Sequence, residues 1–183
     1  MDSKAKQGVA VAVVAAGLAS AAPAAALDTF LKIDGIKGES ADVQHKGEID
    51  ILSWSWGGVM NQSGRTVVNS LVVTKLMDVS SPKLAGLPAG GSGIKTQEVI
   101  LTARRDPRDS VDLFKLDLKD ARVVSVKVSG AHGDARPTEE ITFAFTSASY
   151  TSHTIKADGT LDTGTTVPLN GSSGWDLVTN KGS

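Results

Sequence analysis

The chain has 183 residues, a formal net charge of −1 and no cysteine. This length predicts one domain, or one domain with an extension, and the near-neutral charge argues against a general nucleic-acid binder, which carries a basic excess. The lack of cysteine excludes disulfides, thiol nucleophiles and cysteine metal sites.

The first 26 residues, MDSKAKQGVAVAVVAAGLASAAPAAA, differ in kind from the rest of the chain. Lys4 and Lys6 precede an uncharged apolar run at 9–19, and small residues follow, with A-P-A at 22–24 and A-A-A at 24–26. A positive start, a short apolar stretch and an A-x-A site describe a secretory signal peptide. The apolar run is shorter than the ~20 residues that a membrane span needs.

We expect the segment 1–26 to be a signal peptide that is cleaved after Ala26 or Ala24, which makes the mature protein secreted or periplasmic. Two other interpretations stay open. The segment could instead be a retained helix, rich in alanine and valine, that docks on a neighbour, or a flexible tail. In each case we expect the folded domain to comprise residues 27–183.

From Leu27 onward, apolar and polar residues mostly alternate, which is typical of half-buried β-strands. The expected strands, in chain order, are 29–33, 48–56, 67–77, 96–105, 111–118, 121–129, 140–150 and 175–179. Glycine-rich or polar stretches separate them, and Asp158-Gly159 signals a tight turn.

One short helix interrupts the strands. Ser80 or Ser81 can cap it, Pro82 suits its first turn, and Pro88 ends it by Leu87. The sequence therefore predicts a mainly-β fold, an antiparallel β-barrel or sandwich of about eight or nine strands with one short flanking helix.

The stretch EIDILSWSWG at 48–57 contains two of the three tryptophans, Trp54 and Trp56. On one strand 48–56 they point the same way, together with Leu52, and the other face carries Ile49, Ile51, Ser53 and Ser55. An exposed pair could stack sugars or bases. Because Leu52 shares their face, we favour a core or a subunit seam over a ligand platform.

The residue types that catalyse reactions or bind metals are not spaced along the sequence as a catalytic or metal-binding motif requires. His45, His132 and His153 lack metal-ligand spacing and are expected at the surface. Ser92 lies in G-G-S-G, which is not the G-x-S-x-G of a nucleophile elbow. The basic cluster at 104–108 is interpreted as a solvated strand end or an interface with an acidic patch. We therefore expect no enzyme, no catalytic residue, no cofactor and no metal.

Several stretches resemble one family in the same order along the chain. DTFLKIDGIKGES at 28–40 and HKGEIDILSWSWG at 45–57 resemble the Hcp (haemolysin-coregulated protein) family, and so does LVVTKLMDVSSPKL at 71–84. Supporting stretches are FKLDLKDARVVSVKVSG at 114–130, TEEITFAFTSASY at 138–150 and G-W-D at 174–176. The resemblance spans residues 27–181.

This resemblance implies a β-barrel with one flanking helix, whose hexameric rings stack into the inner tube of a type VI secretion system. Its partners would be further copies of itself, and also the sheath, a tip protein and small effector proteins carried in the lumen. It implies no nucleic acid and, for the mature form, no membrane. The N-terminal segment departs from the family, whose tube proteins are made in the cytoplasm and then exported by type VI secretion. Because the chain stops soon after Trp175, we expect no C-terminal toxin domain.

Two functions from different classes follow. The first is a structural, self-assembling tube subunit. The alternative is a secreted monomeric β-barrel binding module, which holds a protein or glycan through loops at 57–66 or 86–96. The oligomeric state separates them.

Overall fold

The computed structural model describes residues 27–60, 62, 66–68, 70–89, 96–105, 111–168, 175–176 and 181–182. Its elements, in chain order, are β1 (Asp28–Ile33), β2 (Ile49–Ile51), β3 (Ser53–Ser55), β4 (Gly58–Met60), β5 (Thr66–Val68), β6 (Leu71–Leu76), α1 (Ser81–Ala89), β7 (Thr96–Arg104), β8 (Phe114–Ser129), β9 (Thr138–Ala144), β10 (Ser147–Ile155), β11 (Leu161–Pro168), β12 (Trp175–Asp176) and β13 (Lys181–Gly182).

The strands form an antiparallel barrel, as the sequence predicts. Strand pairing runs from β1 through β7, β8, β9 and β6 to β3. β3 continues from β2 through the single residue Leu52, and β2 pairs with the other edge of β1. The stretch 49–55 therefore closes the circuit, although no single strand carries the hydrogen bonds all the way round.

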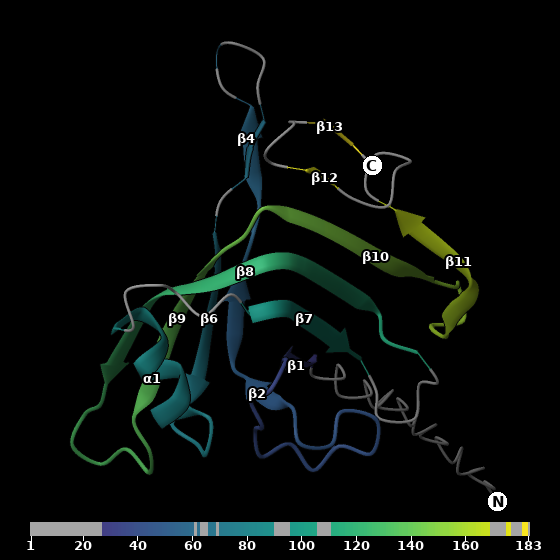
Figure 1. Cartoon of the computed structure of the whole chain (residues 1–183). Helices are drawn as coiled ribbons and strands as arrows, with labels where there is room; N and C mark the ends of the chain where they lie inside the picture. The colour runs from purple at the N-terminus through teal and green to yellow at the C-terminus, as the bar shows by residue number, and fades with distance from the viewer. Residues whose placement is uncertain are drawn as a thin grey trace, which may run out of the picture.

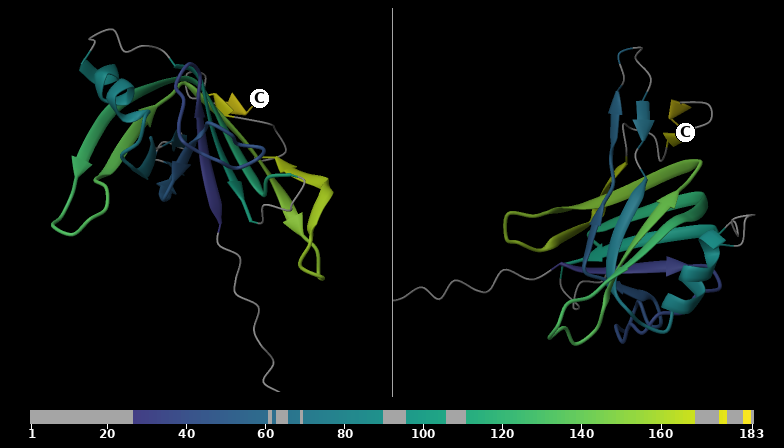
Figure 2. Two further views of the ribbon diagram at one scale, coloured as in Figure 1. Left: turned by 90° about the horizontal axis from the view of Figure 1, so that it is seen from below. Right: turned by 90° about the vertical axis from the view of Figure 1, so that its left-hand side faces the viewer.

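Three appendages leave this barrel. β10 pairs with the first half of β8 and carries β11 and then β12 and β13 beyond the barrel. β4 and β5 form a separate two-stranded hairpin that projects from one end, at the top of Figure 1 and again in the right view of Figure 2. Helix α1 packs against β8 and buries Leu84 and Leu87 in the core.

Inward-facing apolar side chains of the barrel strands make one continuous core. Fully buried members are Leu31, Ile49, Leu71, Val73, Leu84, Val99, Leu101, Leu116, Leu118, Ile141 and Phe143. Except for Leu84 of helix α1, they come from alternate strand positions, as the period-two pattern predicts. The barrel core therefore follows from the alternation of apolar and polar residues along the strands.

The stretch 48–56 is not one strand. Ile49 and Ile51 are buried, Leu52 is 59% exposed, and the two tryptophans beyond it pack on the core. The predicted sharing of one face by Leu52, Trp54 and Trp56 is therefore wrong. At Leu52 the chain leaves β1 and joins β6, with the Leu52 N–H donating to the Thr74 carbonyl at 2.8 Å, and this bend moves the alternation by one residue.

The expected strands 111–118 and 121–129 are one long strand, β8. A kink at Asp120, whose φ is 50°, moves the alternation: Leu118 is buried before it, and Ala121 and Val123 are buried after it. Val124 and Val128, further along the same strand, are half exposed. An aspartate tolerates this left-handed backbone better than a branched residue does. The expected strand 140–150 is also divided, into β9 and β10.

Helix α1 begins as predicted and ends later. The Leu84 N–H donates to the Ser80 carbonyl at 3.0 Å, so Ser80 holds the cap position. The helix runs to Ala89, past the predicted end at Leu87, and Pro88 lies in its last turn. Pro88 has no N–H to donate to the Leu84 carbonyl, but the helix continues through it to Ala89.

Some sequence predictions lie outside the described residues. They concern the signal peptide at 1–26, Ser92, positions 106–108 of the basic cluster and the end of the last strand at 177–179. In the described part of the chain, no helix is long and apolar enough to cross a membrane.

Candidate assembly surfaces

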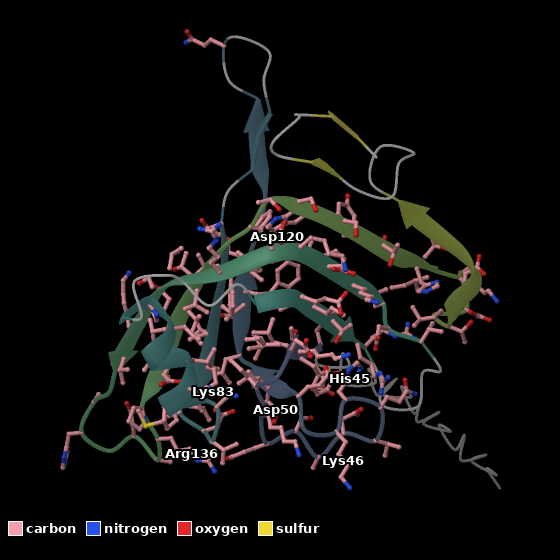
Figure 3. The ribbon with its side chains drawn as sticks, in the orientation of Figure 1. His45, Lys46, Asp50, Lys83, Asp120 and Arg136 are labelled. Atoms are coloured by element: carbon pink, nitrogen blue, oxygen red, sulfur yellow. The ribbon has the colours of Figure 1, made fainter. Side chains whose placement is uncertain are left out.

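A groove opens at the end of the barrel opposite the β4–β5 hairpin. It has a volume of about 80 Å³ and is lined by Glu39, Asp50, Leu52, Leu76, Asp78 and Arg136. Figure 3 labels Asp50 and Arg136 in this lower part of the molecule. The lining comes from β2 and the bend that follows it, the end of β6, the turn at 77–80 and two loops, 34–48 and 130–137. We call it the basal groove.

Two loops are tied together at the rim of the basal groove. Arg136 Nη1 lies 3.1 Å from Glu39 Oε2, and Glu39 Oε1 accepts a hydrogen bond from the Val79 N–H at 3.1 Å. The backbone at Gly38 passes against Glu48, where any side chain would collide with the Glu48 backbone. Only glycine allows this close approach, and it holds Glu39 at the rim.

Exposed apolar side chains gather at the basal groove. Leu52 is 59% exposed, Leu76 39%, and Met77 and Val79, which follow β6 directly, are 37% and 62% exposed. Of the three lining carboxylates, Glu39 pairs with Arg136 and Asp78 with Lys75, so Asp50 is the one without an ion pair in the described part of the chain and makes the lining acidic. Such an exposed apolar patch with a charged rim is typical of a protein–protein contact site.

A buried ion cluster lies behind the groove, beneath α1. Lys75 is completely buried, and its Nζ lies 2.7 Å from Glu139 Oε2, 2.8 Å from Asp78 Oδ1 and 3.0 Å from Ser81 Oγ. Burial raises the pKa of the Asp78 carboxyl, but hydrogen bonds from Lys75 and Ser80 outweigh it and hold that pKa below its ordinary range. The cluster ties β6, β9 and the start of α1 together. We call it the helix clamp.

A second cluster fastens the loop 38–48 to the barrel wall. His45 Nδ1 lies 2.9 Å from Glu48 Oε2, and His45 Nε2 lies 3.0 Å from Asp112 Oδ1. Its ring stacks on Phe30 of β1, with centroids 4.3 Å apart and planes 9° apart. His45 is only 6% exposed, so the prediction of a surface histidine is wrong for this residue. His132 is exposed, as predicted.

Arg104 of β7 completes this second cluster, which we call the loop clamp. Its Nη1 lies 3.2 Å from Asp42 Oδ1, its Nη2 lies 3.3 Å from Asp112 Oδ1, and it donates to the Gln44 amide oxygen. Arg104 is 1% exposed, so a solvated strand end is the wrong interpretation of this position. The loop folds over the outer face of β7 and covers it.

Local spacing gives no sign of the loop clamp. His45 and Asp112 are 67 positions apart, and Arg104 and Asp42 are 62 apart. Nor is the clamp a metal centre: among the described residues no set of three or more histidine, aspartate or glutamate side chains is arranged to hold an ion.

The tryptophans belong to an aromatic cluster at the edge of the core. Trp54 stacks on Phe114 at 5.2 Å between ring centroids, Phe114 contacts Tyr150 at 5.6 Å, and Trp56 meets Tyr150 edge-on at 5.6 Å. Both indoles are partly buried against the core. This arrangement agrees with the core interpretation rather than with a ligand platform.

Known proteins share this arrangement. Residues 30–151 match the family described as "Type VI secretion system effector, Hcp". Protein hcp1 of Pseudomonas aeruginosa is 35% identical over 165 residues, which are 85% of this chain and 98% of that protein.

Solved structures agree. A type six secretion system protein superposes with a TM-score of 0.75 at 29% identity, over 86% of this chain and 100% of that one. Hcp1 from Salmonella typhimurium superposes with a TM-score of 0.69 at 31% identity, over 86% of this chain and 99% of that one. The chain therefore belongs to the Hcp family of type VI secretion proteins, as its sequence stretches indicate.

Proposed function

We propose that the chain is a structural tube subunit, which forms hexameric rings that stack head to tail into a hollow tube of a type VI secretion system. The observation that carries this proposal is the difference between the two ends of the barrel. One end bears the projecting β4–β5 hairpin, and the other bears the basal groove, where Figure 3 labels Asp50 and Arg136. An open stack needs two unlike surfaces that fit each other, because a self-matching surface closes into a dimer.

The hairpin of one ring is the proposed occupant of the basal groove of the next. The groove offers the exposed apolar side chains Leu52 and Leu76 beside three carboxylates. Asp50 makes no ion pair within the described part of the chain. The hairpin sequence at 57–68, GGVMNQSGRTVV, contains apolar residues, one arginine and no acid. The two surfaces are therefore complementary in charge and in polarity.

A structural role also accounts for the chemistry of the clusters. The titratable groups of the helix clamp and the loop clamp are occupied with one another, and each joins parts of the fold. We propose that the protein is not an enzyme and that its partners are copies of itself, the sheath, a tip protein and small effector proteins in the lumen.

Leu52→Asp tests the stacking contact. An added carboxylate in an already acidic, apolar-floored groove repels the incoming hairpin surface, while a side chain that is 59% exposed contributes little to the core. We expect the variant to form rings but no tubes in negative-stain electron microscopy and in sedimentation, whereas the unchanged protein forms both.

Ile155→Asp is the matched control, because Ile155 is 52% exposed at the end of β10 and does not line the groove. It should stack like the unchanged protein. Tubes of undiminished length from Leu52→Asp would reject the groove as the stacking contact, and a monomeric unchanged protein would reject the tube function itself.

The route of export is a separate proposal. The segment 1–26 is proposed as a signal peptide that directs the mature domain 27–183 to the periplasm or outside; the alternative is synthesis in the cytoplasm and export by type VI secretion. N-terminal sequencing of the protein from cells distinguishes the two. A start at Leu27 or Ala25 supports cleavage, and a start at the first residues contradicts it.

A further inference from the structure

Both ring nitrogens of His45 face carboxylate oxygens, Nδ1 at 2.9 Å from Glu48 and Nε2 at 3.0 Å from Asp112. A neutral imidazole has one N–H, so it can satisfy only one of these two acceptors. The imidazolium form has two N–H groups and satisfies both. The geometry therefore corresponds to the charged ring, which is shielded from water on one side by Phe30.

The charges around the ring come from three elements. The loop itself contributes Glu48 and Asp42, β7 contributes Arg104, and the segment 111–113 contributes Asp112. The other groups against the ring, Phe30 of β1 and Thr102 of β7, are uncharged. With His45 charged, two cations face three carboxylates. With His45 neutral, Arg104 is the one cation that faces the same three carboxylates. One ring nitrogen of His45 then has no proton, and its lone pair faces the oxygen of a carboxylate.

We propose that His45 is a protonation-dependent latch: its imidazolium fastens the loop 38–48 to the segment 111–113, and loss of one proton loosens the loop, which Arg104 still holds at Asp42. The loosened loop is the one that places Glu39 at the rim of the basal groove. The link to stacking rests on the proposed function. The latch itself does not, because all of its groups belong to one copy of the chain.

The sign of the effect follows from the charge count. The latch is closed while His45 holds both protons and opens when a rise in pH removes one of them. As the pH falls, protonation of the carboxylates sets the lower limit of the closed state. Burial raises the pKa of Asp42, but the N–H groups of Gln44 and His45 together with Arg104 outweigh burial and keep that pKa below its ordinary value. Asp42 therefore stays ionised below its ordinary range and continues to pair with Arg104 there.

Hydrogen exchange measured by mass spectrometry on the whole protein reads the latch directly. Amides in the loop are bonded within it: Gly38 to the Gly47 carbonyl at 2.8 Å, Ser40 to Glu48 at 3.0 Å and Gly47 to Ser40 at 2.9 Å. After correction for intrinsic exchange, protection of the peptide 38–48 should fall about tenfold between about pH 5.5 and about pH 8.5, as one charge-assisted hydrogen bond is lost.

Three variants sharpen the measurement. His45→Gln should give low protection without this pH dependence. Asp112→Asn keeps an acceptor but removes a negative charge, so its fall should come at lower pH than in the unchanged protein. His132→Gln replaces an exposed histidine and should keep the fall. Asp112→Asn also provides the test if His45→Gln does not fold.

The outcomes are distinct. A flat profile in the unchanged protein, the same fall in His45→Gln, or no displacement in Asp112→Asn overturns the latch. Leu52→Asp, which is designed to prevent stacking, separates this proposal from the proposed function. A fall that persists in Leu52→Asp supports a latch within one copy, and a fall that vanishes there overturns it.

Discussion

The helix clamp and the loop clamp are both buried ion clusters, but they differ in what they hold. Lys75 lies inside the barrel, fully buried, and joins β6 to β9 and to the start of α1. His45 lies outside the barrel wall and joins a surface loop to it. A lysine and a glutamate keep their charges at ordinary pH, whereas a histidine can lose its charge there. The same chemistry therefore fixes the fold in one place and leaves a loop adjustable in the other.

Breaking the helix clamp should have the largest effect. Glu139→Ala removes the carboxylate at 2.7 Å from the completely buried Lys75 ammonium. Removing one partner of a buried ion pair costs about 3–5 kcal/mol, and because Asp78 Oδ1 still lies 2.8 Å from Lys75 Nζ, we expect a loss of about 3 kcal/mol, at the lower end of that range. Urea unfolding followed by tryptophan fluorescence measures the loss.

The double variant Lys75→Met with Glu139→Leu is the control for this prediction. Without either charge, part of the lost stability should return, and the remainder reflects Asp78, which then lacks its Lys75 partner. A loss below about 1 kcal/mol for Glu139→Ala alone would mean that Lys75 reaches water.

Trp54→Ala tests the aromatic cluster, and its effect should be intermediate. The ring stacks on Phe114 but is only partly buried, so the cost should be about 2–4 kcal/mol, at the lower end of what a fully buried ring costs. Urea unfolding is followed by far-UV circular dichroism, because the substitution removes a fluorophore. Unchanged stability would place the ring outside the core and restore the ligand-platform interpretation.

Arg104→Met should cost about 2 kcal/mol, because it leaves Asp42 and Asp112 without their shared cation while the aliphatic stem is kept. The damage should concentrate in the loop 38–48 and spare the barrel. Hydrogen exchange resolved by peptide distinguishes this local loss from a global one; equal loss of protection in β8 would contradict a clamp limited to the loop.

A fall in pH should weaken the helix clamp by protonating Asp78. Because the pKa of Asp78 is lowered in the folded protein, its contribution to stability is present above its ordinary value of about 4 and is lost as the pH falls toward the lowered one. Asp78→Asn should therefore flatten the acid side of the stability profile and leave its alkaline side alone. Thermal unfolding between about pH 2 and about pH 6 tests this.

The smallest effect is expected at an ion pair outside both clamps. Lys127 Nζ lies 2.9 Å from Glu140 Oε1, with side chains that are 70% and 44% exposed. Lys127→Ala should change the free energy of unfolding by less than about 0.5 kcal/mol, because exposed pairs are screened and mobile. A loss comparable to that of Arg104→Met would remove the distinction between buried clamps and surface pairs.

The alternation of apolar and polar residues predicts the barrel strands, because burial of one strand face is visible in the local sequence, and the helix is predicted by its capping serines and its prolines. The strand prediction failed at Leu52 and Asp120, where a bend moves the alternation by one residue, since a bend depends on which strand is paired with which. No local pattern in the sequence indicates either clamp. His45 was expected at the surface because its partner Asp112 is distant in sequence and only the folded chain brings them together.

The account rests most on the assembly of identical copies through unlike ends of the barrel. Cryo-electron microscopy of the purified protein at high concentration tests this directly. The account predicts six-membered rings in head-to-tail stacks, with the β4–β5 hairpin of each copy against Leu52 and Asp50 of the next. Solitary subunits, or rings that pair only through the same end, would contradict it.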